Sequence, residues 1–358
     1  GNRMYSENFM IYAVAVLSFF LSFGGFYYLS LRNEELEPSK NTPFLIMLPV
    51  LAAAFLFLFS QLSDQRDFIF SLKLEQLLFP LGASAVIYFG SRFQASPYMR
   101  TVVIMFCSAA AFFLQPEGFE LAPGLNSLCS GLILSLILFL FSVFYPYINK
   151  IDGISGIQSA GIGMGIFTLS LIGGVPALLG AFGLSLAAVV GAFLIFNWYP
   201  AKLSLTSAGS SALGFLLGWL MLIGTYEGSG PAIIIFALFF IVEILTALLK
   251  FITLRPEYRN LAANTNCYQA NLSGFPPYSI AANVFRLQLI LLIMGSFELY
   301  APNAYTIPLF TLVVTAWYLS KIKNWQTANK TIREINRDLM TEIKNNINTI
   351  KDQINKEK

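Results

Sequence analysis

The sequence predicts an all-α, polytopic membrane protein: a bundle of about eleven transmembrane helices followed by a cytoplasmic amphipathic helix. Of its 358 residues, 56% are hydrophobic and 11% are charged, and the mean hydropathy is +0.67. Soluble domains carry about 25% charged residues, so these values exclude a soluble globular enzyme. Apolar runs near the roughly 20 residues that cross a bilayer also recur along the whole chain.

Each predicted span is an apolar run bounded by polar residues, glycine or proline. Several runs are short or rich in glycine. In chain order, they lie near residues 9–31, 43–62, 74–90, 99–115, 127–148, 157–174, 176–198, 208–226, 230–252, 280–300 and 304–321. Residues 1–320 are therefore predicted to form one transmembrane unit.

The Lys and Arg residues gather at alternate ends of these spans, which predicts the orientation because cytoplasmic loops are enriched in them. One set of ends holds Arg32, Lys40, Arg92, Arg100, Lys150, Lys202, Lys250, Arg255, Arg259 and Arg286. The other set holds only Arg3, Arg66 and Lys73, beside six acidic residues. This places the N-terminus outside and the C-terminus in the cytoplasm, and we expect a bacterial inner membrane.

Three features of the composition exclude classes of function or of site. The net charge of +3 is too small to indicate nucleic-acid binding. Histidine is absent, which removes the commonest general base and metal ligand. The three cysteines, Cys107, Cys129 and Cys267, show neither a disulfide framework nor the spacing of a zinc site.

Residues 321–358 form a separate segment with nine Lys/Arg and five Asp/Glu. Apolar residues recur there at three- and four-residue steps, which predicts one helical stripe: Ile332, Ile335, Leu339, Ile343, Ile347, Ile350 and Ile354. The helix would pack on its own bundle or the membrane surface, or pair with a protein partner or a second copy. The spacing, about 3.7 residues per turn, disfavours a long heptad coil, which requires 3.5.

Three predicted cytoplasmic segments carry a family resemblance. Residues 197–210, followed by Leu213-Gly214-Phe215, read NWYPAKLSLTSAGS and resemble N-x-x-P-A-K-[apolar]3-G-D-[AS]-G-S…L-G-F. Residues 149–156 (NKIDGISG) resemble N-x-x-D-G-x-D-G, and residues 90–100 resemble D-D-R-[FY]-x-L-S-x-x-[IVLM]-[RK]. These are signatures of the polyprenyl-phosphate N-acetylhexosamine-1-phosphate transferases. The resemblance implies eleven spans and a role in cell-envelope polysaccharide biosynthesis.

The chain departs from the family at most of its acidic positions. Gly90 and Ser91 replace an Asp pair, Ser155 replaces the second Asp of D-G-x-D-G, and Ser207 replaces an Asp that ligates magnesium in the family. An H-x-H-H cluster is replaced at about residues 265–268. Mg²⁺ normally needs one or two carboxylates, and a serine hydroxyl brings no charge. Asp152 is the one carboxylate left in the aligned motifs, so no metal cofactor is expected.

The retained residues are the candidate site. Asp152 is the candidate catalytic residue, and lipid-phosphate binding is predicted for Asn149, Asp152, Lys202, Ser207, Ser210 and Arg100. The alternative is structural, because Asp, Ser and Gly commonly cap helices and form turns. Lys202 would then only mark the cytoplasmic side.

Two charged residues lie inside predicted spans, where an unpaired charge is costly. Glu243 and Arg286 lie at similar predicted depth, so an ion pair between them is one prediction and separate cavity-facing roles are the other. The nearly uncharged polar residues of the 253–279 loop suit hydrogen bonding to a sugar or a partner, or an ordinary loop.

Three functions remain open. The first is a catalytically degenerate pseudoenzyme that binds polyprenyl phosphate or a protein partner. The second is an active transferase that moves a sugar phosphate from a UDP-sugar, with Mg²⁺ held by Asp152, substrate phosphates and serine hydroxyls. The third is a transporter, although its usual broken helices and inverted repeats are not evident in the sequence.

Overall fold

The computed structural model describes residues 2–32, 43–62, 72–93, 96–253, 260–301, 303 and 305–325. These residues are all α-helical apart from short 3₁₀ turns and connecting loops, as predicted. The α-helices are α1 (Asn2–Arg32), α2 (Phe44–Leu62), α3 (Leu74–Phe93), α4 (Pro97–Ala111), α5 (Ser127–Ile148), α6 (Ile154–Leu171), α7 (Ala177–Asn197), α8 (Ser207–Tyr226), α9 (Gly230–Phe236), α10 (Leu238–Thr253), α11 (Asn266–Leu272), α12 (Pro277–Glu298) and α13 (Thr306–Lys323).

Every predicted span is occupied by helix, and eight helices of the described ranges are long and apolar enough to cross a membrane. A ninth is added if α9 and α10 form one span. The helices α3 and α13 lie at predicted spans but are not among the eight. The chain is thus a multi-pass helical protein, while the number eleven stays a prediction.

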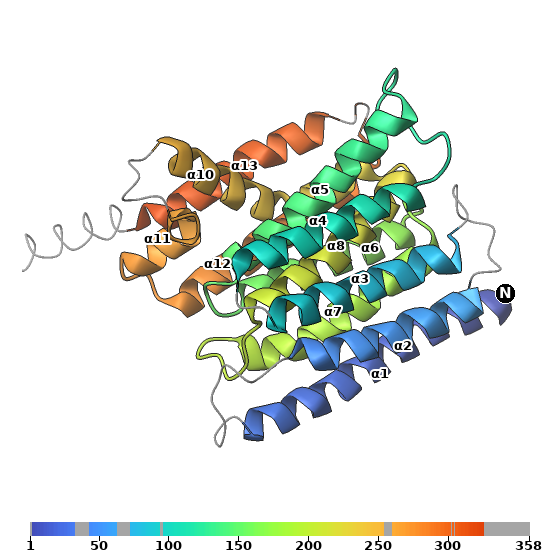
Figure 1. Ribbon diagram of the computed structural model, residues 1–358, viewed down its shortest axis with the longest axis horizontal. Helices are drawn as coiled ribbons and strands as arrows, with labels where there is room; N and C mark the ends of the chain where they lie inside the picture. Colours follow the sequence, from blue (N-terminus) through green and yellow to red (C-terminus); the bar gives the residue numbers. More distant parts are fainter. Residues whose placement is uncertain are drawn as a thin grey trace, which may run out of the picture.

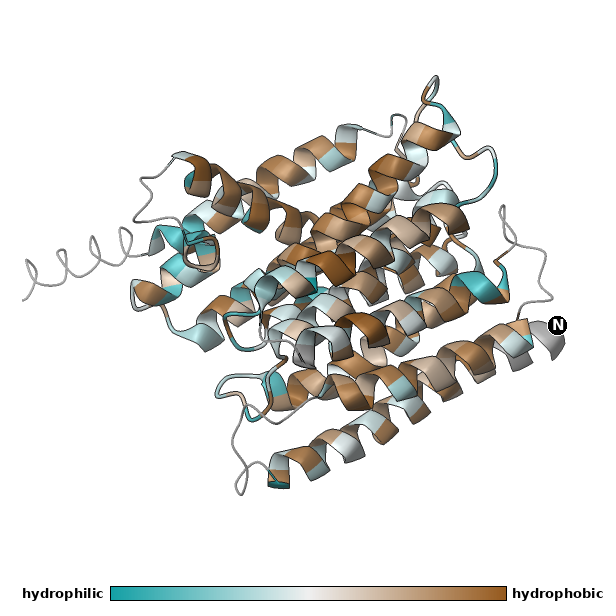
Figure 2. Ribbon diagram, in the orientation of Figure 1, coloured by the Kyte–Doolittle hydropathy of each residue, from teal (hydrophilic) through white to brown (hydrophobic). Residues whose placement is uncertain are grey.

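The helices run up and down in one bundle, with α1 and α2 on one side and α10, α11 and α13 on the other (Figure 1). The central helices α6, α7 and α8 are the most buried of the candidate spans. Figure 2 shows hydrophobic residues along most helices and hydrophilic ones gathered at helix ends and around α11. We call the end that holds residues 149–153 and 198–206 the motif end.

The helices α6 and α7 make the closest contact in the bundle because small residues line it. A Cβ atom built on Gly163 would lie 2.6 Å from the carbonyl oxygen of Gly183, and the converse distance is also 2.6 Å. Small residues let helix backbones approach in this way, so that dispersion contacts replace the hydrophobic effect that is weak in lipid.

The predicted continuous span 230–252 is broken. The axes of α9 and α10 differ by 68° at Ala237, which interrupts the helical hydrogen bonding. The carbonyl oxygen of Phe236 accepts hydrogen bonds from the side-chain amides of Gln158 (3.2 Å) and Gln288 (3.0 Å). Two other helices, α6 and α12, therefore satisfy the backbone group that the break exposes, as a membrane interior requires.

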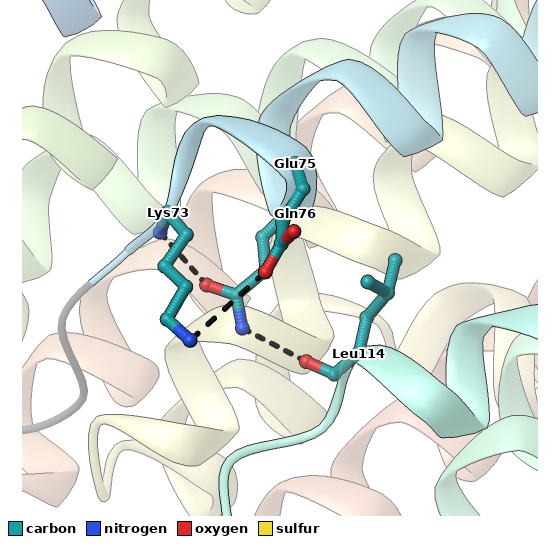
Figure 3. Close-up of polar contacts among 4 residues, drawn as sticks. All are labelled: Lys73, Glu75, Gln76 and Leu114. Atoms are coloured by element: carbon teal, nitrogen blue, oxygen red, sulfur yellow. Dashed lines mark hydrogen bonds and ion pairs between the residues drawn. The ribbon is translucent and has the colours of Figure 1, made fainter.

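At the end opposite the motif end, Gln76 ties the start of α3 to the turn after α4. Its side chain accepts a hydrogen bond from the Lys73 amide (2.9 Å) and donates one to the Leu114 carbonyl (2.8 Å), as Figure 3 shows. The Lys73 ammonium lies 4.0 Å from Glu75, and both side chains are well exposed, so this ion pair contributes little.

The predicted boundary at 320 lies inside α13, which continues to Lys323. Trp325 then stacks on Phe275 with ring centroids 4.9 Å apart, so residues 321–325 belong to the bundle. The rest of the predicted amphipathic tail, residues 326–358, lies outside the described residues.

Candidate functional site

Two of the motif segments are held together by Asn197, the last residue of α7. Its side-chain oxygen accepts a hydrogen bond from the Gly153 amide (3.0 Å), and its side-chain nitrogen donates one to the Leu203 carbonyl (2.8 Å). Asn197 is 1% exposed. Gly153 has a φ of 86°, a left-handed conformation that favours glycine. Sequence reasoning quoted Asn197 as part of a motif but did not include it among the site residues.

Asp152 makes the second link between these segments. Its Oδ2 atom accepts a hydrogen bond from the Ala201 amide at 3.1 Å, across 49 positions of sequence. The side chain is half-buried in the turn before α6. This contact fits the structural interpretation of Asp152, and one carboxylate oxygen is left for another partner.

Asn149 links the same turn to the start of α8. Its side-chain nitrogen donates to the Leu205 carbonyl (2.7 Å), and its side-chain oxygen accepts from the Ser155 hydroxyl (2.6 Å). Ser155 is fully buried. The side-chain nitrogen and oxygen of Asn149 therefore both make hydrogen bonds within the fold.

Replacing Asn197 tests whether it fastens the two segments. We expect Asn197→Ala to lower the free energy of unfolding by about 2 kcal/mol, because it leaves a buried amide and a carbonyl unpaired. Asn197→Asp keeps the acceptor for Gly153 but buries a carboxylate oxygen against the Leu203 carbonyl, so it should lose at least as much. An SDS titration of the purified variants measures both, with the exposed Asn324→Ala as control. Equal stability of all three variants would contradict the assignment.

The predicted phosphate-binding residues of the next segment lie at the start of α8. Thr206 caps this helix by accepting from the Gly209 amide (3.2 Å), while Ser207 is exposed in the first turn. Ser210 is fully buried, and its hydroxyl has no hydrogen-bond partner in the structure. Lys202 is exposed in the loop before the cap. Of these residues, Lys202 and Ser207 face solvent or head groups directly.

The third segment lies at the end of α3 and the start of α4. Arg100 is half-buried in the first turns of α4 and lies within electrostatic range of Tyr147 on α5. The Ser91 hydroxyl donates to the Ile87 carbonyl of its own helix at 2.5 Å. Gly90 faces α4: a Cβ atom built on Gly90 would lie 3.5 Å from the Val103 side chain. The hydrogen bonds of Ser91 and Asp152 go to different partners, and the third segment shares this end of the bundle with the other two.

A comparison with models of protein families identifies the family of the chain. Residues 43–225 match the profile described as Glycosyl transferase family 4, which is half of the chain and includes all three motif segments. The chain belongs to glycosyl transferase family 4. The match ends with α8, so the broken helix, the 260–276 segment and α12 lie beyond it. A comparison with curated proteins gave no match.

The residues of this family 4 member do not fit a carboxylate-based Mg²⁺ site at the motif end. The hydroxyls of Ser155 and Ser91 donate hydrogen bonds to the Asn149 side-chain oxygen and the Ile87 carbonyl. Asp152 already accepts from a backbone amide. In the described part of the chain, no group of three or more His, Cys, Asp and Glu side chains is placed to hold a metal ion. Mg²⁺ prefers hard, charged oxygen ligands, which are too few here.

The predicted ion pair between Glu243 and Arg286 is wrong. Glu243 is 1% exposed on α10, and its two oxygens accept from the amides of Asn266 (2.7 Å) and Cys267 (3.1 Å) at the start of α11. Arg286 is exposed on α12, and no salt bridge joins the two in the described structure. Backbone amides at a helix N-terminus can stabilise a buried carboxylate, so Glu243 does not need a second buried charge as its partner.

Lys250 completes this cluster between α10 and the 260–276 segment. Its ammonium donates to the Asn264 carbonyl (2.9 Å), the Asn266 side chain (3.2 Å) and the Gln269 side chain (3.0 Å). Burial and the nearby Glu243 carboxylate raise the pKa of the Cys267 thiol well above its usual range, so the thiol stays protonated at neutral pH. The polar loop thus binds its own bundle, as an ordinary loop would.

A narrow cavity lies between this cluster and the second motif segment. Its lining includes Tyr147, Lys150, Ile151, Glu243 and Tyr268. Thr265 and Cys267 also line it, so the start of α11 faces the motif end. The alignment of residues 265–268 with a histidine cluster stays a prediction.

Proposed function

We propose that this family 4 member is a catalytically degenerate homologue of the polyprenyl-phosphate sugar-phosphate transferases that still binds a polyprenyl-phosphate-type lipid. The observation that carries the proposal is that motif residues make hydrogen bonds that hold the fold together. Hydrogen bonds made by the side chains of Asp152, Asn149 and Ser155 hold residues 149–156 and 197–206 in place. The motif segments are thus held together, while few carboxylates are left to hold the Mg²⁺ that would neutralise two phosphates.

Lys202 and Ser207 supply the binding chemistry in this proposal. Lys202 is exposed in the loop before α8 and Ser207 in its first turn, where the helix N-terminus carries partial positive charge. Arg100 adds a cation at the same end of the bundle. Together these groups suit the phosphate of an anionic lipid, whose hydrocarbon chain would lie in the bilayer beside the bundle.

We also propose that the motif end faces the cytoplasm of a bacterium and that the chain acts in cell-envelope polysaccharide biosynthesis. The distribution of cations supports this orientation. Arg32, Arg100, Lys150, Lys202 and Lys250 all lie at or near the motif end of their helices or in its loops. Cytoplasmic loops of bacterial membrane proteins carry such an excess.

A turnover assay separates the degenerate enzyme from an active one. Purified protein with Mg²⁺, polyprenyl phosphate and a panel of UDP-sugars should release no UMP and form no lipid-linked product. Mg²⁺-dependent product that Asp152→Asn abolishes would overturn the proposal and establish a divergent transferase. Substrate-dependent flux in proteoliposomes would instead favour transport, the function that the broken α9–α10 pair makes worth testing.

A binding measurement with polyprenyl phosphate tests the second part of the proposal, that the chain still binds this lipid. We expect Lys202→Gln to weaken binding about fivefold, the effect of one cation near a membrane surface. Asp152→Asn keeps an acceptor for the Ala201 amide and removes a negative charge, so binding should be unchanged or tighter. Lys73→Gln, at the other end of the bundle, is the matched control. Native mass spectrometry of the bound lipid measures all three, and no detectable binding by the unmodified chain would contradict the proposal.

A further inference from the structure

A cleft opens between α12 and α13 near the motif end, outside the residues matched by the family profile. Its volume is about 390 Å³, and its lining includes Phe275, Asn283, Trp317, Tyr318, Lys321 and Trp325. The Tyr318 hydroxyl donates to the Asn283 side chain at 3.1 Å and so joins the two helices at its floor. Tryptophan, tyrosine and lysine together are typical of the membrane–water interface.

The cleft is positively charged. The Lys321 ammonium lies over the Trp317 ring, 4.4 Å from its centroid, which holds the cation at the opening. Arg286 on α12 is exposed and lies within electrostatic range of Tyr318. No acidic side chain lines the cleft within the described residues. A cation inside a predicted span is costly without an anion or water to meet it, so Arg286 calls for a negative partner.

The cleft also presents an unused hydrogen-bond donor. The indole nitrogen of Trp325 is buried and has no partner in the structure. Its ring is stacked on Phe275 at an interplanar angle of 18°, which fixes its orientation. A buried N–H without an acceptor costs about 1–3 kcal/mol. A phosphate oxygen at this position would remove that cost.

Below the cleft, both helices expose apolar side chains that continue away from the motif end. On α13 they follow helical spacing from Trp317 through Val313 to Phe310 and Leu309, each more than half exposed. On α12 they include Ile293. The ligand that fits this surface has an anionic head and long hydrocarbon chains.

We propose that the α12–α13 cleft is a binding site for an anionic phospholipid, with the phosphate between Arg286, Lys321 and Trp325 and the acyl chains along α13. This site uses none of the residues assigned to polyprenyl phosphate. It is therefore a second lipid site, and its test is independent of the proposed function.

Lipid retention tests the site directly. The full chain is placed in an equal mixture of phosphatidylglycerol and phosphatidylcholine, extracted, and examined by native mass spectrometry. We expect preferential retention of phosphatidylglycerol. Arg286→Gln/Lys321→Gln should reduce that retention at least fivefold, the effect of a single cation at the surface, and up to about 25-fold if the two free energies add. Trp325→Phe keeps the stacking on Phe275, removes the N–H, and should give a smaller reduction.

A control separates this site from other cations. Arg32→Gln removes an exposed arginine at the motif end of α1 and should leave retention unchanged. Equal retention of the two lipids by the unmodified chain would overturn the proposal. Unchanged retention in the double variant would overturn it as well.

Discussion

Gly163→Ala should lower the free energy of unfolding by about 2 kcal/mol, and Gly163→Leu should prevent accumulation of folded protein. The added Cβ would lie 2.6 Å from the carbonyl oxygen of Gly183 and 3.2 Å from the Ala187 backbone nitrogen. Backbone atoms cannot rotate away, so α6 and α7 must separate along their contact. Overpacking of this kind costs about 1–3 kcal/mol, more than the roughly 1 kcal/mol that alanine gains over glycine in a helix.

Gly191 provides a matched control on the same pair of helices. It lies inside α7, and a Cβ there meets nothing within 4 Å. Gly191→Ala should therefore be neutral or stabilising by up to about 1 kcal/mol through helix propensity alone. An SDS titration of both alanine variants in one detergent gives the comparison. Equal stabilities would show that the α6–α7 contact is looser than the structure has it.

Glu243→Ala should release the start of α11 from α10 and destabilise the protein by about 3 kcal/mol. The substitution leaves the buried amides of Asn266 and Cys267 without an acceptor, and each unpaired group costs about 1–3 kcal/mol. It also leaves the Lys250 ammonium without the nearby negative charge. Because the contact is local, the opening should be confined to residues 260–276.

Hydrogen exchange distinguishes this local effect from global unfolding. At 1.4 kcal/mol per factor of ten, exchange at Asn266 and Cys267 should be faster on the order of 100-fold in Glu243→Ala. Glu243→Gln retains one acceptor and should show a clearly smaller increase. Glu298→Ala removes another buried glutamate, at the opposite end of α12, and should leave these two amides protected. Exchange that rises equally in every helix would contradict a local role.

The helices themselves were predictable because a bilayer leaves the backbone few choices. Unpaired N–H and C=O groups are too costly in hydrocarbon, so a long apolar run that spans the membrane must be helical. All eleven predicted ranges are helical for this reason. The break at Ala237 was not predictable from the same rule. It depends on two glutamine side chains, Gln158 and Gln288, that come from distant parts of the chain.

The candidate site divides in the same way. The motif letters identified the family and the residues that meet at one end of the bundle, and the family profile confirms that membership. They did not reveal that Asp152 reaches the Ala201 amide or that Asn197 bridges Gly153 and Leu203. Nor did they reveal the partners of Glu243, because similar depth in two spans carries no information about which helices are neighbours.

By itself, the sequence determined an all-helical membrane protein of glycosyl transferase family 4 with few acidic residues in its motifs. Hydropathy and residue identity are local properties, and they suffice for these conclusions. Only the tertiary structure decided which polar groups are already occupied and which remain for a ligand. That distinction depends on contacts between residues far apart in the chain. In a low-dielectric interior, a polar group with a hydrogen-bond partner and the same group without one differ in free energy by several kcal/mol, on the order of the cost of burying it unpaired.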